Sequence, residues 1–377
     1  MPGPLTPDGA LPASPAAPPP QPLTCGDEPQ RRRSEKWALL FAALVLLVGA
    51  AFGAGGFLLE QATSNWRPQI ARTQSGWHIT EVRQLGFSGL ALCGEHIAWQ
   101  DGASILLLDL ASGEPKLLGP GAMARATWPP AVSARYVVWF EGTRGGASSA
   151  NTWTYDTATR RRRQVATVGD VLSLPSVSGA RAVWCTAQRG KMRIVGVDLT
   201  TDKDLLVASE YGQPVIDGAL VAWARSTGGG PSSFVLVDVT QGRSWTVIPS
   251  GLGGAAELTG FDLSGRTLVW GQLDPRTGVG RIVAQNVDTG AASVVAESTV
   301  GATAPSVDGG AVVWAERTPD AAAYRVMGRR LGGGPSFQIA RVGGKVLTAL
   351  ISGDTVAWLV DNGGRSPTWI ETMRIPR

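Results

Sequence analysis

From about residue 90 onward, apolar positions alternate with polar ones in short runs separated by tight turns. Residues 305–314, Pro-Ser-Val-Asp-Gly-Gly-Ala-Val-Val-Trp, show the pattern most clearly. Glycine accepts the positive φ of a two-residue hairpin, and Asp or Ser bonds to the turn backbone, so Asp-Gly predicts a turn here. The apolar alternation after it predicts a strand packed on one face. The segment therefore predicts a strand, a tight turn and a second strand.

The chain contains seven copies of this unit. Each copy ends in a tryptophan: Trp99, Trp139, Trp184, Trp223, Trp270, Trp314 and Trp358. Five residues earlier stands a small turn residue: Gly94, Ala134, Gly179, Gly218, Gly265, Gly309 and Gly353. Successive tryptophans are 39 to 47 residues apart, and a period of about 40–45 residues built from short strands is typical of β-propeller blades. We therefore predict an all-β fold over residues 76–377: a seven-bladed β-propeller of four-stranded antiparallel blades.

The last copy lacks one strand. After Trp358 only residues 367–375 resemble a strand before the chain ends, whereas the other copies continue to a fourth strand. A spare strand is predicted near residues 76–82, ahead of the first copy. We expect this N-terminal strand to complete the last blade and close the ring, because closure removes exposed sheet edges.

The N-terminal region predicts a membrane anchor. Residues 37–59, from Trp37 to Leu59, carry no charge over 23 residues, which is long enough for one transmembrane helix. Basic residues flank this stretch on its N-terminal side only: Arg31, Arg32, Arg33 and Lys36. The positive-inside rule then predicts a cytoplasmic N-terminus, contact between residues 37–59 and membrane lipid, and an extracytoplasmic propeller. A cleaved signal peptide is the alternative.

Amino-acid composition predicts the character of the segments on either side of this anchor. Residues 1–36 are rich in Pro and Ala and cannot bury a core, so we expect a disordered cytoplasmic tail. Residues 60–75 are expected to form a polar stalk. The predicted protein is thus a single-pass protein of the cell membrane.

Charge and cysteine content narrow the possible functions. The net charge of +4 is too small and too dispersed to indicate a nucleic-acid partner. Three cysteines are too few for a disulfide framework. Cys25 lies in the predicted tail, and Cys93 and Cys185 fall in blades that should not be neighbours, so we expect them to be unpaired.

No catalytic constellation is found in the sequence. The two histidines, His78 and His96, lie in strand-like segments, and there is no metal-spaced His/Cys cluster, nucleophile elbow or phosphate-binding glycine motif. Five repeats place an aspartate near the end of the third strand: Asp109, Asp156, Asp198, Asp238 and Asp288. Each precedes a short turn, so these residues are expected to cap turns rather than bind metal. We predict no catalytic, cofactor-binding or metal-binding residue.

The repeat resembles a known family. The pattern Pro-x-[Val/Ile]-[Ser/Asp]-Gly-x-x-Val-[Val/Ala]-Trp, followed by a strand such as Ile-Val-Gly-Val-Asp-Leu, resembles the TolB-like β-propeller repeats of bacterial and archaeal cell-surface proteins. The resemblance covers about residues 77–377. The turn lacks the proline of the better-known Ser-Pro-Asp-Gly version. The resemblance implies the propeller fold, and such propellers serve many unrelated roles.

The two faces of the predicted propeller differ. The first-to-second and third-to-fourth strand connections share one face, here called the turn face. The second-to-third connections and those between blades share the other, called the loop face, where longer and more variable loops are expected to carry binding residues. Our candidates at four blade junctions are Trp128, Asp170, Tyr211 and Glu297, with ordinary loop or packing roles as the alternative.

A basic run, Arg160-Arg-Arg-Arg163, falls on the turn face. It could touch an anionic wall polymer or lipid headgroup, or simply keep an edge strand solvated. Two function hypotheses follow. The first is a surface-displayed binding or scaffold module for a protein or envelope polymer. The second is an extracytoplasmic hydrolase or lyase at the channel mouth, which predicts a cluster of titratable groups with perturbed pKa values there.

Overall fold

A computed structural model describes residues 68–82, 89–101, 104–119, 128–142, 149–226, 231–249, 257–298, 302, 304–320, 323–361 and 368–375. All of these residues belong to one compact unit, Ala62–Arg377. The predicted tail, the predicted membrane segment and residues 60–67 of the predicted stalk lie outside the described residues. Within the described part of the chain, no helix has the length and apolar character needed to cross a membrane.

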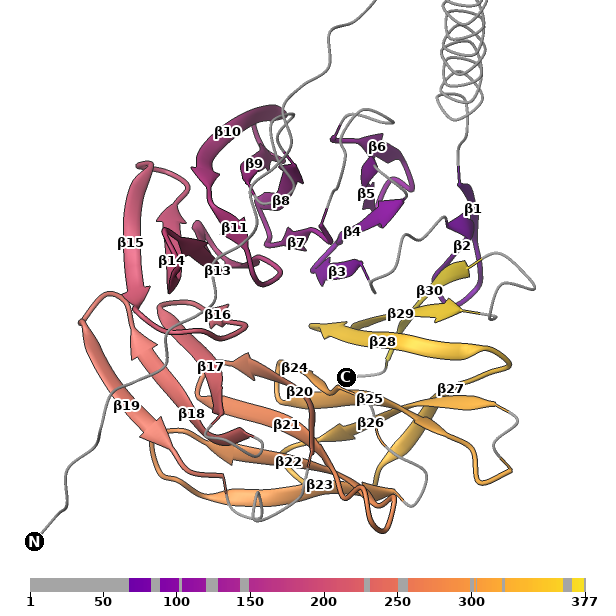
Figure 1. Cartoon of the computed structure of the whole chain (residues 1–377). Coiled ribbons are helices and arrows are strands. Elements are labelled where there is room, and N and C mark those ends of the chain that lie inside the picture. Colours follow the sequence, from indigo (N-terminus) through magenta and orange to yellow (C-terminus); the bar gives the residue numbers. More distant parts are fainter. Residues whose placement is uncertain are drawn as a thin grey trace, which may run out of the picture. The chain divides into compact units, whose positions relative to one another are not determined.

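The described residues form seven antiparallel sheets, the blades of a β-propeller (Figure 1). Blade 1 comprises β3 (Leu90–Cys93), β4 (His96–Asp101), β5 (Ser104–Asp109) and β6 (Pro115–Leu117), and blade 2 comprises β7 (Ala131–Val132), β8 (Tyr136–Gly142), β9 (Ala150–Asp156) and β10 (Arg161–Val168). Blade 3 comprises β11 (Asp170–Val171), β12 (Ser176–Ser178), β13 (Arg181–Gln188), β14 (Lys191–Asp198) and β15 (Lys203–Ala208). Blade 4 comprises β16 (Val215–Asp217), β17 (Leu220–Ser226), β18 (Pro231–Asp238) and β19 (Arg243–Val247).

Blades 5 to 7 follow in chain order. Blade 5 comprises β20 (Glu257–Ser264), β21 (Thr267–Leu273), β22 (Gly280–Asn286) and β23 (Ala292–Ser298), and blade 6 comprises β24 (Ser306–Asp308), β25 (Ala311–Arg317), β26 (Tyr324–Arg330) and β27 (Phe337–Val342). Blade 7 comprises β28 (Lys345–Ser352), β29 (Thr355–Asp361) and β30 (Thr368–Arg374), with β2 (Trp77–Val82) and β1 (Gln69–Arg72). The innermost strands contact one another in the cyclic order β3, β7, β12, β16, β20, β24, β28 and again β3. The prediction of seven four-stranded antiparallel blades is confirmed.

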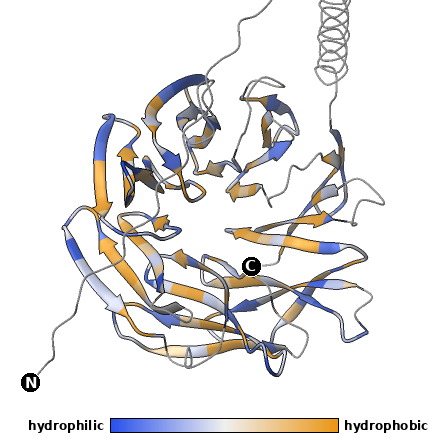
Figure 2. Ribbon diagram, viewed as in Figure 1, coloured by the Kyte–Doolittle hydropathy of each residue, from blue (hydrophilic) through white to orange (hydrophobic). Residues whose placement is uncertain are grey.

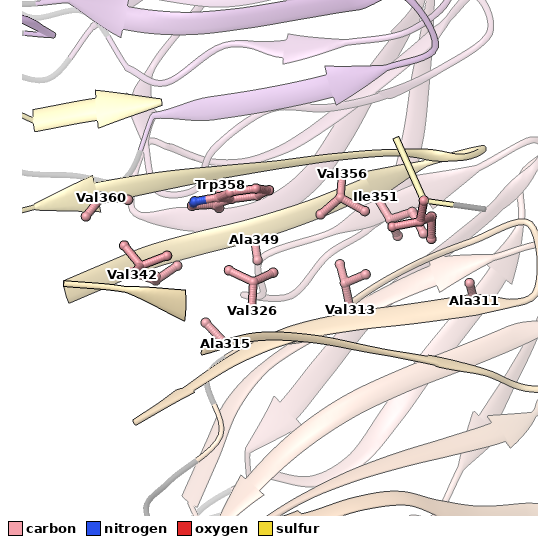
Figure 3. Close-up of a cluster of buried hydrophobic side chains, with 12 residues drawn as sticks. Ala311, Val313, Ala315, Val326, Val342, Ala349, Ile351, Val356, Trp358 and Val360 are labelled. Atoms are coloured by element: carbon pink, nitrogen blue, oxygen red, sulfur yellow. The ribbon is translucent and has the colours of Figure 1, made fainter. Parts of the chain in front are cut away.

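The repeated tryptophans hold neighbouring blades together. Each lies on the second strand of its blade and is no more than 2% exposed. Each also belongs to an apolar cluster shared with the preceding blade, as Trp358 does with Val313 and Val326 (Figure 3). The strands that carry the tryptophans are mostly hydrophobic (Figure 2), and residues such as Val137–Phe140 of β8 are buried without interruption. A large aromatic side chain at this position buries much apolar surface between the sheets, which explains why the repeat carries it.

The turn face carries a second set of contacts between blades. The residue before the turn glycine accepts a hydrogen bond from the turn N–H of the next blade, over distances of 2.6–2.9 Å, in four pairs: Ser178 with Gly218, Asp217 with Gly265, Asp308 with Gly353, and Ser352 with Gly94. The sequence predicted that these polar side chains bond their own turns. Their reach to the neighbouring blade couples the blades at the level of the turns.

The first described strands lie in the last blade. β2 pairs antiparallel with β30 through His78↔Glu371 and Ile79↔Ile370. β1, within the segment predicted to be stalk, forms an additional outer strand on β2 instead. Trp77 lies over blade 1, where its indole N–H donates to the carbonyl of Leu110 at 3.0 Å. Blades 7 and 1 thus share contacts made by the N-terminal strands.

Candidate functional site

The loop face is defined by strand direction. In an antiparallel blade whose strands follow in order, the second-to-third connections and the connections between blades emerge on the same side. The sequence predicted long and variable connections on this face, and at least one of them is short. In blade 3 the second and third strands are joined by Arg189 and Gly190 alone. The hairpin is possible because both residues adopt positive φ, 53° and 75°.

Three inner strands reach farther toward the loop face than the others. The inner ladders of blades 3, 5 and 7 extend to Asp170↔Ala187, Glu257↔Leu273 and Lys345↔Asp361. Among the described residues, the inner strands of blades 1, 2, 4 and 6 have 4, 2, 3 and 3 residues, and blade 6 adds one isolated bridge, Ala302↔Glu316. The side chains of Asp170, Glu257 and Lys345 are exposed. We call these three residues the channel mouth.

Irregular pairing accompanies each long inner strand. The ladders of β20 and β28 shift register between Leu258 and Gly260 and between Val346 and Thr348. Gly260 has φ of 151°, and a Cβ there would lie 2.5 Å from the Cβ of Ala304, so only glycine fits. In blade 3 the strand is interrupted instead, and the Ser173 hydroxyl accepts a hydrogen bond from the N–H of Cys185 at 2.8 Å. Such bulges re-aim side chains at sheet ends.

Sequence reasoning identified one of the three channel-mouth residues, Asp170, and missed Glu257 and Lys345. A signal for Glu257 was present. An isolated glycine inside a predicted strand, here Gly260, suggests a bulge. No comparable signal marks Lys345, because its ladder shifts at Leu347, an ordinary aliphatic position.

The other sequence candidates lie apart from the mouth. Trp128 is half-buried against blades 2 and 3, with its ring edge-on to Phe140 at 6.3 Å between centroids. Glu297 lies on the outer strand of blade 5, 3.1 Å from the guanidinium of Arg281. Tyr211 is 60% exposed at the junction of blades 3 and 4. Together with Asp170 they occupy four separate junctions, and the polar contacts of Asp170 and Glu297 remain within their own blades.

The basic run on the turn face is partly used inside the scaffold. Arg162 stacks on Trp153, 3.9 Å from the ring centroid, and donates to both carboxylate oxygens of Glu141 at 2.8 and 2.9 Å. The buried Glu141 also accepts the indole N–H of Trp139 at 2.7 Å. Arg163 binds Asp202 in blade 3. Arg160 and Arg161 are exposed, and the side chain of Arg162 is 30% exposed where it lies on Trp153.

A similar arrangement recurs in blade 6. The buried carboxylate of Glu316 accepts the indole N–H of Trp314 at 3.1 Å and pairs with Arg325. In both places the acid stands two residues after the repeat tryptophan, on the same side of the strand. These carboxylates therefore hold the repeat tryptophan and an arginine within their own blade.

One carboxylate on the inner strands has a strongly raised pKa. Burial raises the pKa of Asp262 to about 6, although hydrogen bonds from Val307 N–H, Leu263 N–H and the Ser306 hydroxyl act in the opposite direction. The nearby negative charge of Asp308 adds to the increase. The carboxylate joins β20 of blade 5 to β24 of blade 6 through donors at 2.9 and 3.0 Å.

The remaining perturbed acids are turn caps or ion-pair partners. The Asp156 carboxylate binds Arg135 and accepts two backbone N–H groups, which holds its pKa well below the usual range. Asp109, Asp198 and Asp238 likewise accept N–H groups of their own turns. This confirms the predicted capping role in four repeats. In the fifth, the cap is Asn286 rather than Asp288.

The histidines and cysteines occupy structural positions. His78 lies 3.2 Å from Glu371 across the β2–β30 ladder. Cys93 and Cys185 are unpaired, as predicted, and burial raises the pKa of both thiols. Within the described ranges, no group of three or more His, Cys, Asp or Glu residues could hold a metal ion.

Comparison with known proteins bears on the fold. No family model and no curated protein matches the sequence. Oligogalacturonate lyase from Vibrio parahaemolyticus is 11% identical, with a TM-score of 0.57 over 82% of this chain and 97% of that one. The β-propeller domain of the Trilobed protease from Pyrococcus furiosus is 10% identical, with a TM-score of 0.56 over 75% and 92%. This chain shares their fold.

TolB from Acinetobacter baumannii is also similar, at 15% identity and a TM-score of 0.44 over 71% of this chain and 77% of that one. That score is too low to support an argument. At these identities the lyase and protease similarities establish a β-propeller scaffold and leave its activity open.

Proposed function

We propose that the protein is a membrane-anchored, extracytoplasmic β-propeller that binds a protein or an envelope polymer at its loop face. The proposal rests mainly on the position and exposure of the three channel-mouth residues. Three inner strands extend to this face and present exposed charges of both signs on a rigid ring: Asp170, Glu257 and Lys345. Mixed exposed charge suits recognition of a polar partner surface more than it suits chemistry on a buried substrate.

A closed ring is part of the proposal. The β2–β30 ladder, the contact between β28 and β3, and the bond from Gly94 N–H to Ser352 join the last blade to the first. We infer that the N-terminal strand closes the propeller by this route. A closed ring keeps the loops of the loop face at fixed spacing, which favours binding by a preformed surface.

The anchor rests on the sequence. A charge-free stretch over residues 37–59 follows a basic cluster, which favours a single span with the propeller outside. Expressed in cells, the full chain should resist alkaline extraction from membranes, and a chain lacking residues 37–59 should not. Cys25 in the tail should react with a membrane-impermeant thiol reagent only after permeabilisation, whereas a Thr201→Cys variant on the turn face should react in intact cells. Reaction of Cys25 in intact cells would contradict the proposed orientation.

Binding at the loop face is tested by charge reversal. We expect crosslinking and pull-down with the full chain to recover a partner from an envelope extract, and Asp170→Lys with Glu257→Lys to lose it. The matched control is Glu114→Lys with Asp204→Lys, two exposed acids on the turn face. Equal recovery by both variants would place the binding surface elsewhere.

The enzyme alternative has one supporting feature, the raised pKa of Asp262. That carboxylate accepts hydrogen bonds from Val307 N–H and the Ser306 hydroxyl of the next blade, and from Leu263 N–H on its own strand. It thus has a place in the contact between two blades, whereas hydrolase or lyase chemistry requires a cluster of perturbed groups around a substrate. We therefore favour the binding function.

A further inference from the structure

The loop face of blade 3 carries a projecting hairpin of unusual composition. Its tip comprises Arg189, Gly190, Lys191 and Met192, between β13 and β14, which are paired up to Gln188↔Lys191. Arg189 and Lys191 are exposed, and Met192 is 49% exposed. Met192 stands two residues from Ile194, which is fully buried between blades 3 and 4. The apolar side of the strand therefore continues past the packed part of the blade into solvent.

The cations of this tip have few neutralising partners. Arg193, one step farther along the strand, adds a third positive group. Glu210, an acid at the junction of blades 3 and 4, is held by Arg225 at 2.8 and 2.9 Å. Asp170 is the exposed acid on this side, opposite Ala187. The tip thus retains a positive excess.

An exposed aromatic residue lies at the same blade's outgoing junction. Tyr211 is 60% exposed and follows Glu210 on the loop face. Its neighbour Gly212 packs on the ring of Trp223, where a Cβ would lie 2.7 Å from the indole. The backbone beside Tyr211 is therefore fixed against the blade while its ring faces water. Exposed Tyr and Met beside Lys and Arg are typical of surfaces that meet the interface of a bilayer.

The chain enters the propeller on this face. Trp77, at the start of β2, lies beside the turn after β5, so β2 runs from the turn face to the loop face. β1 is antiparallel to β2, which places Gln69 at the loop face. Residues 60–68 can span at most about 30 Å. If residues 37–59 anchor the chain, as the proposed function holds, the loop face is tethered close to a membrane surface.

We propose that the blade 3 tip and Tyr211 contact anionic lipid headgroups of the membrane that holds the anchor. The proposal rests on the proposed membrane anchor and adds a lipid-binding surface to it. Each Lys or Arg near an anionic membrane favours contact by about fivefold, and Tyr211 and Met192 add apolar contact at the headgroup level. The turn-face run is less suited, since Arg162 and Arg163 are occupied within the scaffold.

The test uses the full chain reconstituted in lipid nanodiscs. Hydrogen exchange is measured for residues 186–194 in phosphatidylcholine alone and with about 30% phosphatidylglycerol. We expect several-fold slower exchange of the tip amides in the anionic discs, and no difference in 1 M salt, where the Debye length falls to about 3 Å. Residues 199–204, the turn of the same blade on the opposite face, provide the internal control and should exchange equally in both lipids.

Charge-removing variants complete the test. Arg189→Asn keeps a residue that tolerates positive φ, and with Lys191→Gln it should abolish most of the lipid-dependent slowing. Lys203→Gln on the turn face should leave it unchanged. The proposed lipid contact is wrong if the tip amides exchange equally in the two lipids, or if the double variant still shows the slowing. Neither result would contradict the proposed membrane anchor. Failure of the chain to enter nanodiscs at all would overturn the anchor and this proposal together.

Discussion

The hydroxyl oxygen of Ser352, in the last blade, accepts a hydrogen bond from the backbone N–H of Gly94, in the first, at 2.9 Å. The two residues are 258 positions apart. Gly94 is the turn glycine of the first repeat, and Ser352 stands just before the turn glycine of the last. The same relation joins Asp308 to Gly353 at 2.7 Å. A contact repeated between neighbouring blades thus also joins the blades at the two ends of the chain.

Replacing Ser352 by Ala should lower the free energy of unfolding by about 1 kcal/mol, the usual net contribution of one hydrogen bond. Urea unfolding followed by circular dichroism measures the change. Ser293→Ala, on the exposed outer strand of blade 5, is the control and should change stability by less than about 0.5 kcal/mol. A loss equal to that of the control would mean that this bond does not stabilise the ring.

Arg162 should be among the most sensitive charged positions. Its replacement by Ala leaves the carboxylate of Glu141 buried without its cation, which should lower stability by about 3 kcal/mol. Adding Glu141→Gln should restore much of the loss, because the amide oxygen still accepts the Trp139 indole N–H and carries no charge. Arg161→Ala, one residue away and exposed, should have little effect. Equal losses for Arg161 and Arg162, measured by denaturant midpoint, would contradict this account.

The sequence predicts the blades because their period is local. Within each copy the tryptophan, the small turn residue and the flanking apolar residues lie within ten residues of one another, so the strand-turn-strand unit is visible in every copy. The partners of the turn side chains were not visible. Asp217 bonds Gly265, 48 residues away, and nothing in one copy distinguishes a bond to its own turn from a bond to the next.

The channel mouth was predicted only in part for a related reason. The length of an inner strand decides which charged residue stands at its loop-face end. In this protein that length depends on bulges in the strand. The bulge between Leu258 and Gly260 shifts the side-chain alternation, so the pattern before it no longer indicates which side chains face the channel. Tyr211 was identified because blade junctions are recognisable from the repeat, even though its exposure was not.

Asp262 should give the stability of the protein an unusual pH dependence. Folding raises the pKa of Asp262 to about 6, above the value of about 4 in an unfolded chain. A group with a raised folded pKa stabilises the fold in its protonated form, so this contribution is full below about pH 4 and is lost as the pH rises through about 6. The difference is up to about 3 kcal/mol.

The Asp262→Asn variant isolates this contribution. The amide resembles the protonated acid, so unfolding in urea between about pH 4 and 8 should lack the step that the parent protein shows. The variant should also be more stable than the parent at the alkaline end. A variant less stable than the parent throughout that range would show that the three donors to the carboxylate outweigh its burial.

Gly113 should prove essential for holding the N-terminal strand against blade 1. A Cβ on Gly113 would lie 2.1 Å from the ring of Trp77, whose indole N–H binds the Leu110 carbonyl. Gly113→Ala should therefore displace the ring and lower the free energy of unfolding by about 1–3 kcal/mol beyond any backbone strain. Gly242→Ala measures the strain alone, since Gly242 has a similar φ, 66° against 74°, and open space around it. If the two alanine variants unfold at the same urea concentration, the Trp77 contact adds nothing to the stability of the protein.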